Sequence, residues 1–125
     1  MKIGTIGAGQ VGGTLGRAWA AKGHQVVLGV RDPRGPKVRE LFNTIGAQHM
    51  ANPRFGTQSA SMLLCGDDLA AKKTVLALAE VLGFDPVDAG PLTQARLLEP
   101  LAMLWISLAS ADGHGPDIAF KLLRR

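Results

Sequence analysis

The chain has 125 residues, a hydrophobic content of 46% and a net charge of +4 at pH 7. This length and apolar share predict a single globular domain over residues 1–125, and they exclude both a two-domain protein and a disordered chain. Aromatic residues make up 5% of the sequence and Tyr is absent. The chain therefore lacks the aromatic platform on which single-stranded nucleic acids stack, and no nucleic-acid partner is expected. The single cysteine, Cys65, excludes an internal disulfide and favours the cytoplasm.

The N-terminal part of the chain predicts a strand, a helix and a second strand. Residues 1–7 alternate apolar with small or polar side chains and end in glycine, as a strand does where it enters a turn. Residues 11–21 carry apolar side chains at helical spacing and stop before Gly23. Residues 25–30 are a β-branched run typical of a strand, and the turn-forming sequence RDPRGP follows at 31–36.

The segment after this turn fits either a helix or a strand. Its apolar residues recur at helical spacing from Val38 to Ile45, with Pro36 near the start. A strand over 38–42 would follow the second strand too soon, because a parallel crossover needs about a dozen residues or more. The helix is therefore the favoured interpretation.

The middle of the chain predicts a second strand–helix–strand unit after a loop. Asp67 or Asp68 can cap the N-terminus of its helix, which explains this acidic pair without a catalytic role. The expected elements are a loop (46–59), a strand (60–66), a helix (69–82) and a short fourth strand (84–89).

The C-terminal part predicts a helical segment from about residue 92. Helices are expected at 94–111 and 117–123, divided by the glycine- and proline-containing residues 113–116. The apolar run within 97–111 is shorter than the ~20 residues that span a bilayer, so no membrane partner is expected. Trp105 and its leucine neighbours predict a core or dimer stripe. A homodimer is expected, with the terminal helices, rich in Leu and Met, as its interface. The alternation of strands and helices predicts an α/β fold, an open parallel sheet of about four strands with helices on both faces.

The strongest motif is GxGxxG, placed between the first strand and the first helix. The first glycine permits the tight turn, the second lets the backbone approach a pyrophosphate, and the third lets the helix pack closely on the strand. The helix N-terminus then offers free N–H groups to the phosphates. The alternative is a glycine-rich turn without a ligand. In this context the motif predicts a shortened Rossmann-like dinucleotide-binding domain, with Gly7, Ala8, Gly9, Gln10, Val11 and Gly12 at the cofactor.

The end of the second strand distinguishes NADP from NAD. An NAD site has an acidic residue there for the ribose 2′-OH, whereas an NADP site has an arginine near the 2′-phosphate. Arg31 directly follows the strand, and Arg34 belongs to the same basic cluster. Asp32 could serve as an NAD-type acid, but the arginines favour NADP(H) as the cofactor.

The chain resembles the NADPH-dependent reductases of coenzyme F420, a deazaflavin, in most of its length. The matching segments are MKIGTIGAGQVGGTLGRAWAAKGHQVVLGVRDP, FNTIGAQHMANPRF, SMLLCGDD and LGFDPVDAGPLTQARLLEPLAMLW. The resemblance implies that Gly7 to Gly12 bind the pyrophosphate, that Arg31 binds the 2′-phosphate, and that the loop from Thr44 to Ala47, including Ile45, lies near the nicotinamide. It also implies direct hydride transfer between NADPH and F420 as co-substrate, with no catalytic side chain.

The chain departs from this family pattern at two places. Val30 stands where family members often have serine, and a central block of strands has no counterpart at the junction of Leu41 and Phe42. Three functions therefore stay open, and with them whether the chain is an enzyme. They are an NADP(H)-dependent oxidoreductase passing a hydride to a deazaflavin-like acceptor, a non-catalytic NADP(H)-binding module, and an internally deleted remnant stabilised by oligomerisation.

The remaining reactive side chains predict neither a metal site nor a nucleophile. The histidines His24, His49 and His114 lack the close ligand spacing of a zinc site. Cys65 ends an apolar strand and is expected to be a buried structural thiol.

Overall fold

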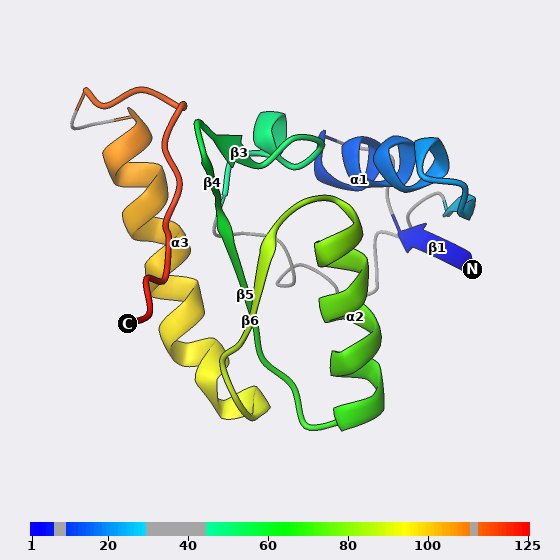
Figure 1. Cartoon of the computed structure of the whole chain (residues 1–125). Coiled ribbons are helices and arrows are strands. Elements are labelled where there is room, and N and C mark those ends of the chain that lie inside the picture. Colours follow the sequence, from blue (N-terminus) through cyan, green and yellow to red (C-terminus); the bar gives the residue numbers. More distant parts are fainter. Residues whose placement is uncertain (7–9, 30–44, 111–112) are drawn as a thin grey trace.

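The computed structural model describes residues 1–6, 10–29, 45–110 and 113–125, and the structural statements below concern those residues. They form two parallel strand pairs, a short antiparallel hairpin and the helices α1, α2 and α3 (Figure 1). The predicted α/β class is confirmed. Within the described residues, however, the parallel strands are hydrogen-bonded as two separate pairs rather than as one sheet of four strands.

The first pair belongs to the predicted N-terminal strand–helix–strand unit. Strand β1 (Lys2–Ile6) pairs in parallel with β2 (Gln25–Gly29), and α1 (Gln10–Ala21) connects them. Gly23 has a φ of 85°, a left-handed conformation that glycine adopts without strain at the end of a helix. The buried face of α1 is formed by Gly13, Leu15, Gly16 and Trp19.

The second pair belongs to a second unit of the same kind. Strand β5 (Ser61–Leu64) pairs in parallel with β6 (Asp85–Asp88), and α2 (Leu69–Val81) connects them. The Asp68 side chain accepts the Ala71 N–H at 2.9 Å, which confirms the expected N-cap. Figure 1 shows α2 and α3 on opposite sides of the β5–β6 pair, as predicted for helices on both faces.

The predicted loop at residues 46–59 contains regular structure that the sequence pattern did not reveal. A short 3-10 helix, η1 (Ala47–His49), precedes a hairpin of β3 (Arg54–Phe55) and β4 (Gln58–Ser59). Gly56 has a φ of 64° in the tight turn between these strands. The expectation of an unstructured loop was therefore wrong, because strands of two residues are too short to produce an alternating pattern.

The C-terminal part contains the predicted helix near 94–111 but not the one at 117–123. After η2 (Leu92–Gln94) and α3 (Ala95–Ser110), the chain from residue 113 onward is non-helical. The Ser61 N–H donates to the Phe120 carbonyl at 3.0 Å, and the Leu122 N–H donates to the Ser61 hydroxyl at 2.9 Å. Residues 116–122, called the C-terminal strap below, thus pair beside the start of β5. The prediction of a helix at 117–123 was therefore wrong. The backbone groups of this segment form hydrogen bonds with Ser61 where a helix would pair them within the segment.

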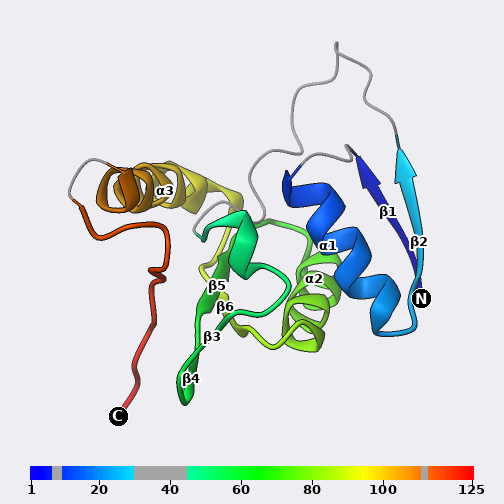
Figure 2. The same ribbon diagram turned by 90° about the horizontal axis from the view of Figure 1, so that it is seen from above.

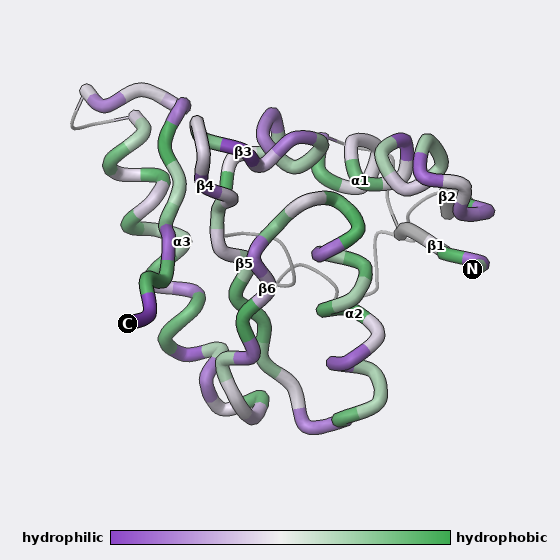
Figure 3. The backbone as a smooth tube through the Cα atoms, in the orientation of Figure 1, coloured by the Kyte–Doolittle hydropathy of each residue, from purple (hydrophilic) through white to green (hydrophobic). Residues whose placement is uncertain are grey.

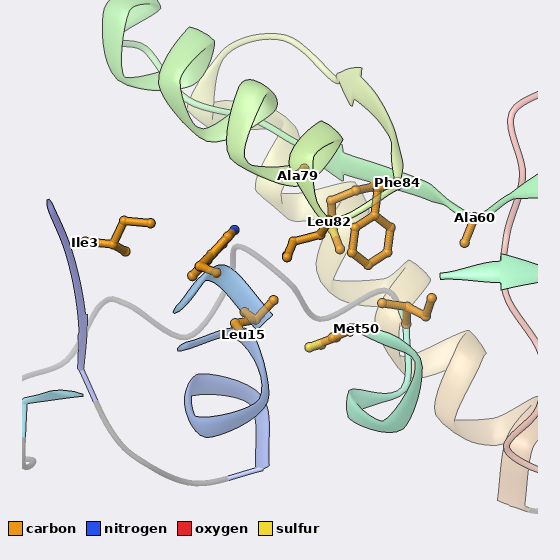
Figure 4. Packing of buried hydrophobic residues seen from close by; sticks show 10 residues of the cluster. Ile3, Leu15, Met50, Ala60, Ala79, Leu82 and Phe84 are labelled. Atoms are coloured by element: carbon orange, nitrogen blue, oxygen red, sulfur yellow. The ribbon is translucent and has the colours of Figure 1, made fainter. Parts of the chain in front are cut away.

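One hydrophobic cluster joins the two strand–helix–strand units. The Trp19 Nε1–H of α1 also donates to the Leu78 carbonyl of α2 at 3.1 Å. Figure 4 shows Leu15, Met50, Leu82 and Phe84 gathered between α1, η1 and the end of α2. The buried residues of the cluster are Ile3, Leu15, Trp19, Ile45, Met50, Ala60, Met62, Ala79, Leu82 and Phe84.

Helix α3 is largely apolar along its length (Figure 3). Leu98 and Ala102 are its buried residues, while four other apolar side chains are 47–62% exposed: Leu97, Met103, Leu104 and Ile106. Among the described residues, no helix combines the length and hydrophobicity needed to cross a membrane.

The pairing of Asp85 with the C-terminal strap gives a pH-dependent contribution to stability. The hydrogen bond that Lys121 Nζ donates to Asp85 Oδ2 at 2.6 Å lowers the pKa of Asp85 below its ordinary 3.8. Because the folded-state pKa lies below the unfolded one, the carboxylate contributes fully above about pH 4. That contribution is lost as the pH falls through the folded-state pKa.

We therefore expect Asp85→Asn to lower the free energy of unfolding near neutral pH by about 1 kcal/mol or less. The difference from the wild type should shrink as the pH falls below about 4 and through the lowered folded-state pKa of Asp85, where the wild-type carboxylate is also neutralised. Urea unfolding at neutral and acidic pH measures this, with the exposed Glu99→Gln as control. A difference that persists unchanged in acid would contradict the role of the Asp85 charge.

Candidate functional site

The candidate site lies at the carboxyl edge of the β1–β2 pair. Strand β1 ends at Ile6 and α1 begins at Gln10, so the connection is as short as a GxGxxG turn requires. Figure 2 shows the carboxyl ends of β1 and β2 and the N-terminal end of α1 at the same edge. Ligands of open α/β sheets bind outside the carboxyl ends of the strands.

The first turn of α1 is suited to an anion. It carries no acidic residue, so no carboxylate of its own competes for the helix N-terminus. Gln10 is exposed and Val11 is 41% exposed, which leaves the beginning of the helix accessible. The unpaired N–H groups and the positive end of the helix dipole favour a phosphate there. The residues present therefore fit the pyrophosphate of a dinucleotide.

The predicted cofactor residues are described only in part. Gln10 and Val11 open α1, and Gly12 is half-buried in its first turn. Gly13 and Gly16 are buried, so the close packing expected from Gly12 involves these two further glycines. The predicted residues outside the described parts are Gly7, Ala8, Gly9, Arg31, Arg34 and Thr44.

Ile45, predicted near the nicotinamide, is buried at 4% exposure and forms an isolated antiparallel bridge with Ala119. The turn η1 that follows it packs against α1. Figures 1 and 2 both show this turn beside the N-terminal half of α1. The residues after Ile45 thus lie beside the half of α1 whose N-terminus is expected to bind the pyrophosphate.

Sequence reasoning missed two polar side chains of η1 that contact the C-terminal strap. Gln48 Nε2 donates to the Pro116 carbonyl at 3.0 Å. His49 Nε2 lies 3.2 Å from the same carbonyl oxygen and 3.1 Å from Asp117 Oδ1. Contacts between residues so far apart in the sequence have no local signature, and the sequence signal nearest to them is the glycine- and proline-containing break at residues 113–116.

At the carboxyl edge of β5–β6, the polar side chains of Lys72, Asp88 and Asp67 form hydrogen bonds with one another or with nearby backbone groups. Lys72 is 8% exposed and its Nζ donates to Asp88 Oδ1 at 2.9 Å and to the Gly90 carbonyl at 3.2 Å. The hydrogen bond from Lys72 holds the pKa of Asp88 below its ordinary 3.8. Asp67 accepts the Leu92 N–H at 2.9 Å. These bonds fix the turn from β6 into η2.

Cys65, at the end of β5, is half-buried rather than fully buried as expected. It follows the last strand residue, where the chain leaves the pair, and this position accounts for its partial exposure. Within the described residues, no group of three or more His, Cys, Asp or Glu side chains could hold a metal ion.

A parallel β–α–β unit with a short glycine-rich connection and an accessible helix N-terminus defines a Rossmann-like α/β protein. Residues 2–82 match the family described as NADP oxidoreductase, coenzyme F420-dependent, and the chain belongs to this family.

A solved structure shares the fold over nearly the whole chain. It is the crystal structure of a "putative F420 dependent NADP-reductase" from Arthrobacter sp. FB24, with a TM-score of 0.80 and 22% sequence identity. The match covers 99% of this chain and 100% of that one. At this identity, the similarity shows the fold alone.

A curated relative matches part of the chain at higher identity. Metalloreductase STEAP3 of Rattus norvegicus is 44% identical over 70 residues, which are 54% of this chain. The chain spans only 14% of the length of that protein.

Proposed function

We propose that the chain is an NADP(H)-binding oxidoreductase that transfers a hydride between NADPH and a deazaflavin-like acceptor such as coenzyme F420. The observation that supports it most is the accessible N-terminus of α1, free of acidic residues, at the carboxyl edge of β1–β2. Because this unit lies inside the region that matches the family, an oxidoreductase is favoured over a module that only binds the dinucleotide.

Each predicted residue has a binding role in this proposal. NADPH, when bound, supplies the hydride. The backbone from Gly7 to Gly12 holds the pyrophosphate. Arg31 and Arg34 pair with the 2′-phosphate. Thr44 and the backbone near Ile45 border the nicotinamide, where the chain orients the two reactants and excludes water. No side chain is required as acid or base.

Replacing Arg31 with alanine should weaken NADPH binding by about tenfold or more, because the 2′-phosphate loses a charge-assisted hydrogen bond. NADH lacks this phosphate, so its affinity should change little. Titration of both dinucleotides, followed by nicotinamide fluorescence, measures the difference. Arg96→Ala, which removes an exposed arginine from α3, is the matched control. A wild-type chain that prefers NADH would reverse the assignment.

The reaction itself is tested with NADPH and oxidised F420. Loss of the deazaflavin absorbance in the presence of the protein is expected, at a rate proportional to protein concentration. Binding is measured in parallel by thermal stability, because a ligand at 100 times its Kd adds about 2.7 kcal/mol. Binding of NADPH with no absorbance change would favour the binding module over the enzyme.

We also propose that the chain acts as a cytoplasmic homodimer. The exposed apolar side chains of α3, including Met103 at 62% and Leu97 at 59%, support this because a second copy would cover them. Light scattering of the purified protein measures its mass in solution, and a clean monomer would contradict the dimer.

A further inference from the structure

The C-terminal strap, residues 116–122, is fastened along its whole length. Trp105 Nε1 of α3 donates to the Ile118 carbonyl at 2.8 Å, and the Lys121 amine pairs with Asp85 of β6 at 2.6 Å. The Leu122 N–H donates to the Ser61 hydroxyl at the start of β5. These contacts hold the strap to α3 and to the β5–β6 pair, independently of the first strand–helix–strand unit.

The same strap contacts both ends of the short segment 45–49. At its start, Ile45 bridges to Ala119 in antiparallel register. At its end, the His49 imidazole lies 3.1 Å from Asp117 Oδ1. The His49 side chain is 19% exposed, whereas the Asp117 side chain is 83% exposed. The strap therefore places the solvent-exposed Asp117 carboxylate beside the largely buried His49 imidazole.

Two further features hold His49 and Gln48 in place. The His49 ring packs against Phe55 with the ring centroids 5.0 Å apart. The Gln48 amide folds over Gly46, where a Cβ atom would lie 2.6 Å from it, and from there it reaches the Pro116 carbonyl. Gly46 thus leaves the space that the Gln48 contact needs.

Segment 45–49 has α1 on its other side. Turn η1 packs against α1, and Figures 1 and 2 both show it beside the N-terminal half of that helix. The strap thus contacts the segment from one side, while the helix expected to carry the pyrophosphate contacts it from the other.

We propose that the C-terminal strap is a positioning element that fixes segment 45–49 against α1 and thereby shapes the nicotinamide half of the dinucleotide site. This inference rests on the proposed function. Asp117 and His49 act here as positioning residues: they hold Ile45 and η1 and do not touch the cofactor. The adenine half, which in the proposed function depends on Arg31, is independent of the strap.

The test compares two ligands that differ in the nicotinamide half. NADPH has both halves, whereas adenosine 2′,5′-bisphosphate has only the phosphorylated adenosine. We expect His49→Gln and Asp117→Asn each to weaken the affinity for NADPH about fivefold. The affinity for adenosine 2′,5′-bisphosphate should stay within about twofold of the wild-type value. Asp117→Glu should restore most of the NADPH affinity. His114→Gln and Glu99→Gln, at exposed positions, are the matched controls.

A second measurement needs no ligand. Amide hydrogen exchange in the Asp117→Asn chain should accelerate together in peptides covering 45–50 and 116–122, relative to the Glu99→Gln control. Faster exchange in the strap alone would overturn the coupling. If the variants lost affinity equally for both ligands, or kept the wild-type affinity for both, the positioning role would be overturned. A wild-type chain that binds neither ligand would instead overturn the proposed function, and this inference with it.

Discussion

A Phe84→Ala chain is expected to lose about 3–5 kcal/mol of its free energy of unfolding, the usual cost of truncating a phenylalanine in a packed core. Phe84 is 4% exposed and directly precedes β6. It belongs to the cluster that includes Leu15 of α1 and Met50 after η1. Truncation would leave a cavity where the two strand–helix–strand units meet, so both should lose stability together.

Urea unfolding followed by both circular dichroism and tryptophan fluorescence measures this effect. Trp19 lies in the first unit and Trp105 on α3, so the fluorescence reports on both parts of the chain. Leu69→Ala, at a side chain that is 75% exposed on α2, is the control and should change stability by less than about 0.5 kcal/mol. If Phe84→Ala destabilised only one of two separate transitions, the shared core would be refuted.

Much of the fold follows from local sequence patterns. The β-branched run at 25–30 and the apolar spacing of 11–21 correspond to β2 and α1, because burial on one face dictates both patterns. Asp68 caps α2 as expected, since an N-cap aspartate satisfies a free N–H within its own turn. Such signals depend on neighbours a few residues away, which is why they can be recognised in a single sequence.

The C-terminal strap shows where local patterns fail. Residues 117–123 have helical apolar spacing, but the Phe120 carbonyl accepts the Ser61 N–H and the Leu122 N–H donates to the Ser61 hydroxyl, far away in the sequence. Lys121 adds an ion pair with Asp85. Tertiary hydrogen bonds can outweigh the small free-energy differences of helix propensity, so the extended form is adopted.

For the candidate site, only the elements on either side of the motif can be compared with the prediction. The glycine-rich turn and the start of α1 are local, and the described ends of β1 and α1 leave the short connection that the motif requires. The contacts of Gln48 and His49 with the strap depend on the folded chain and were missed. The division of the described parallel strands into two separate pairs could not be predicted from the sequence either, because strand pairing is non-local.

Gly9→Ala is expected to abolish measurable NADPH binding or to weaken it by at least about tenfold, which corresponds to about 1.4 kcal/mol. Gly9 lies in the connection between Ile6 and Gln10, where the proposed site requires the backbone to approach the pyrophosphate. In the proposed site, a methyl group at this position would come between the backbone N–H groups and the phosphate oxygens. The lost hydrogen bonds are charge-assisted, so each contributes more than an ordinary one.

Gly4→Ala separates this effect from a general disturbance of β1. A Cβ atom at Gly4 would meet no other atom within 4 Å, so the substitution should leave both stability and binding unchanged. Thermal unfolding with and without NADPH distinguishes the two variants: the ligand-induced stabilisation should persist in Gly4→Ala and vanish in Gly9→Ala. If NADPH raised the unfolding temperature of Gly9→Ala as much as that of the wild type, the phosphate could not lie against this turn. The arginines after β2 would then have to hold the dinucleotide without the N-terminus of α1, the feature on which the proposed function chiefly depends.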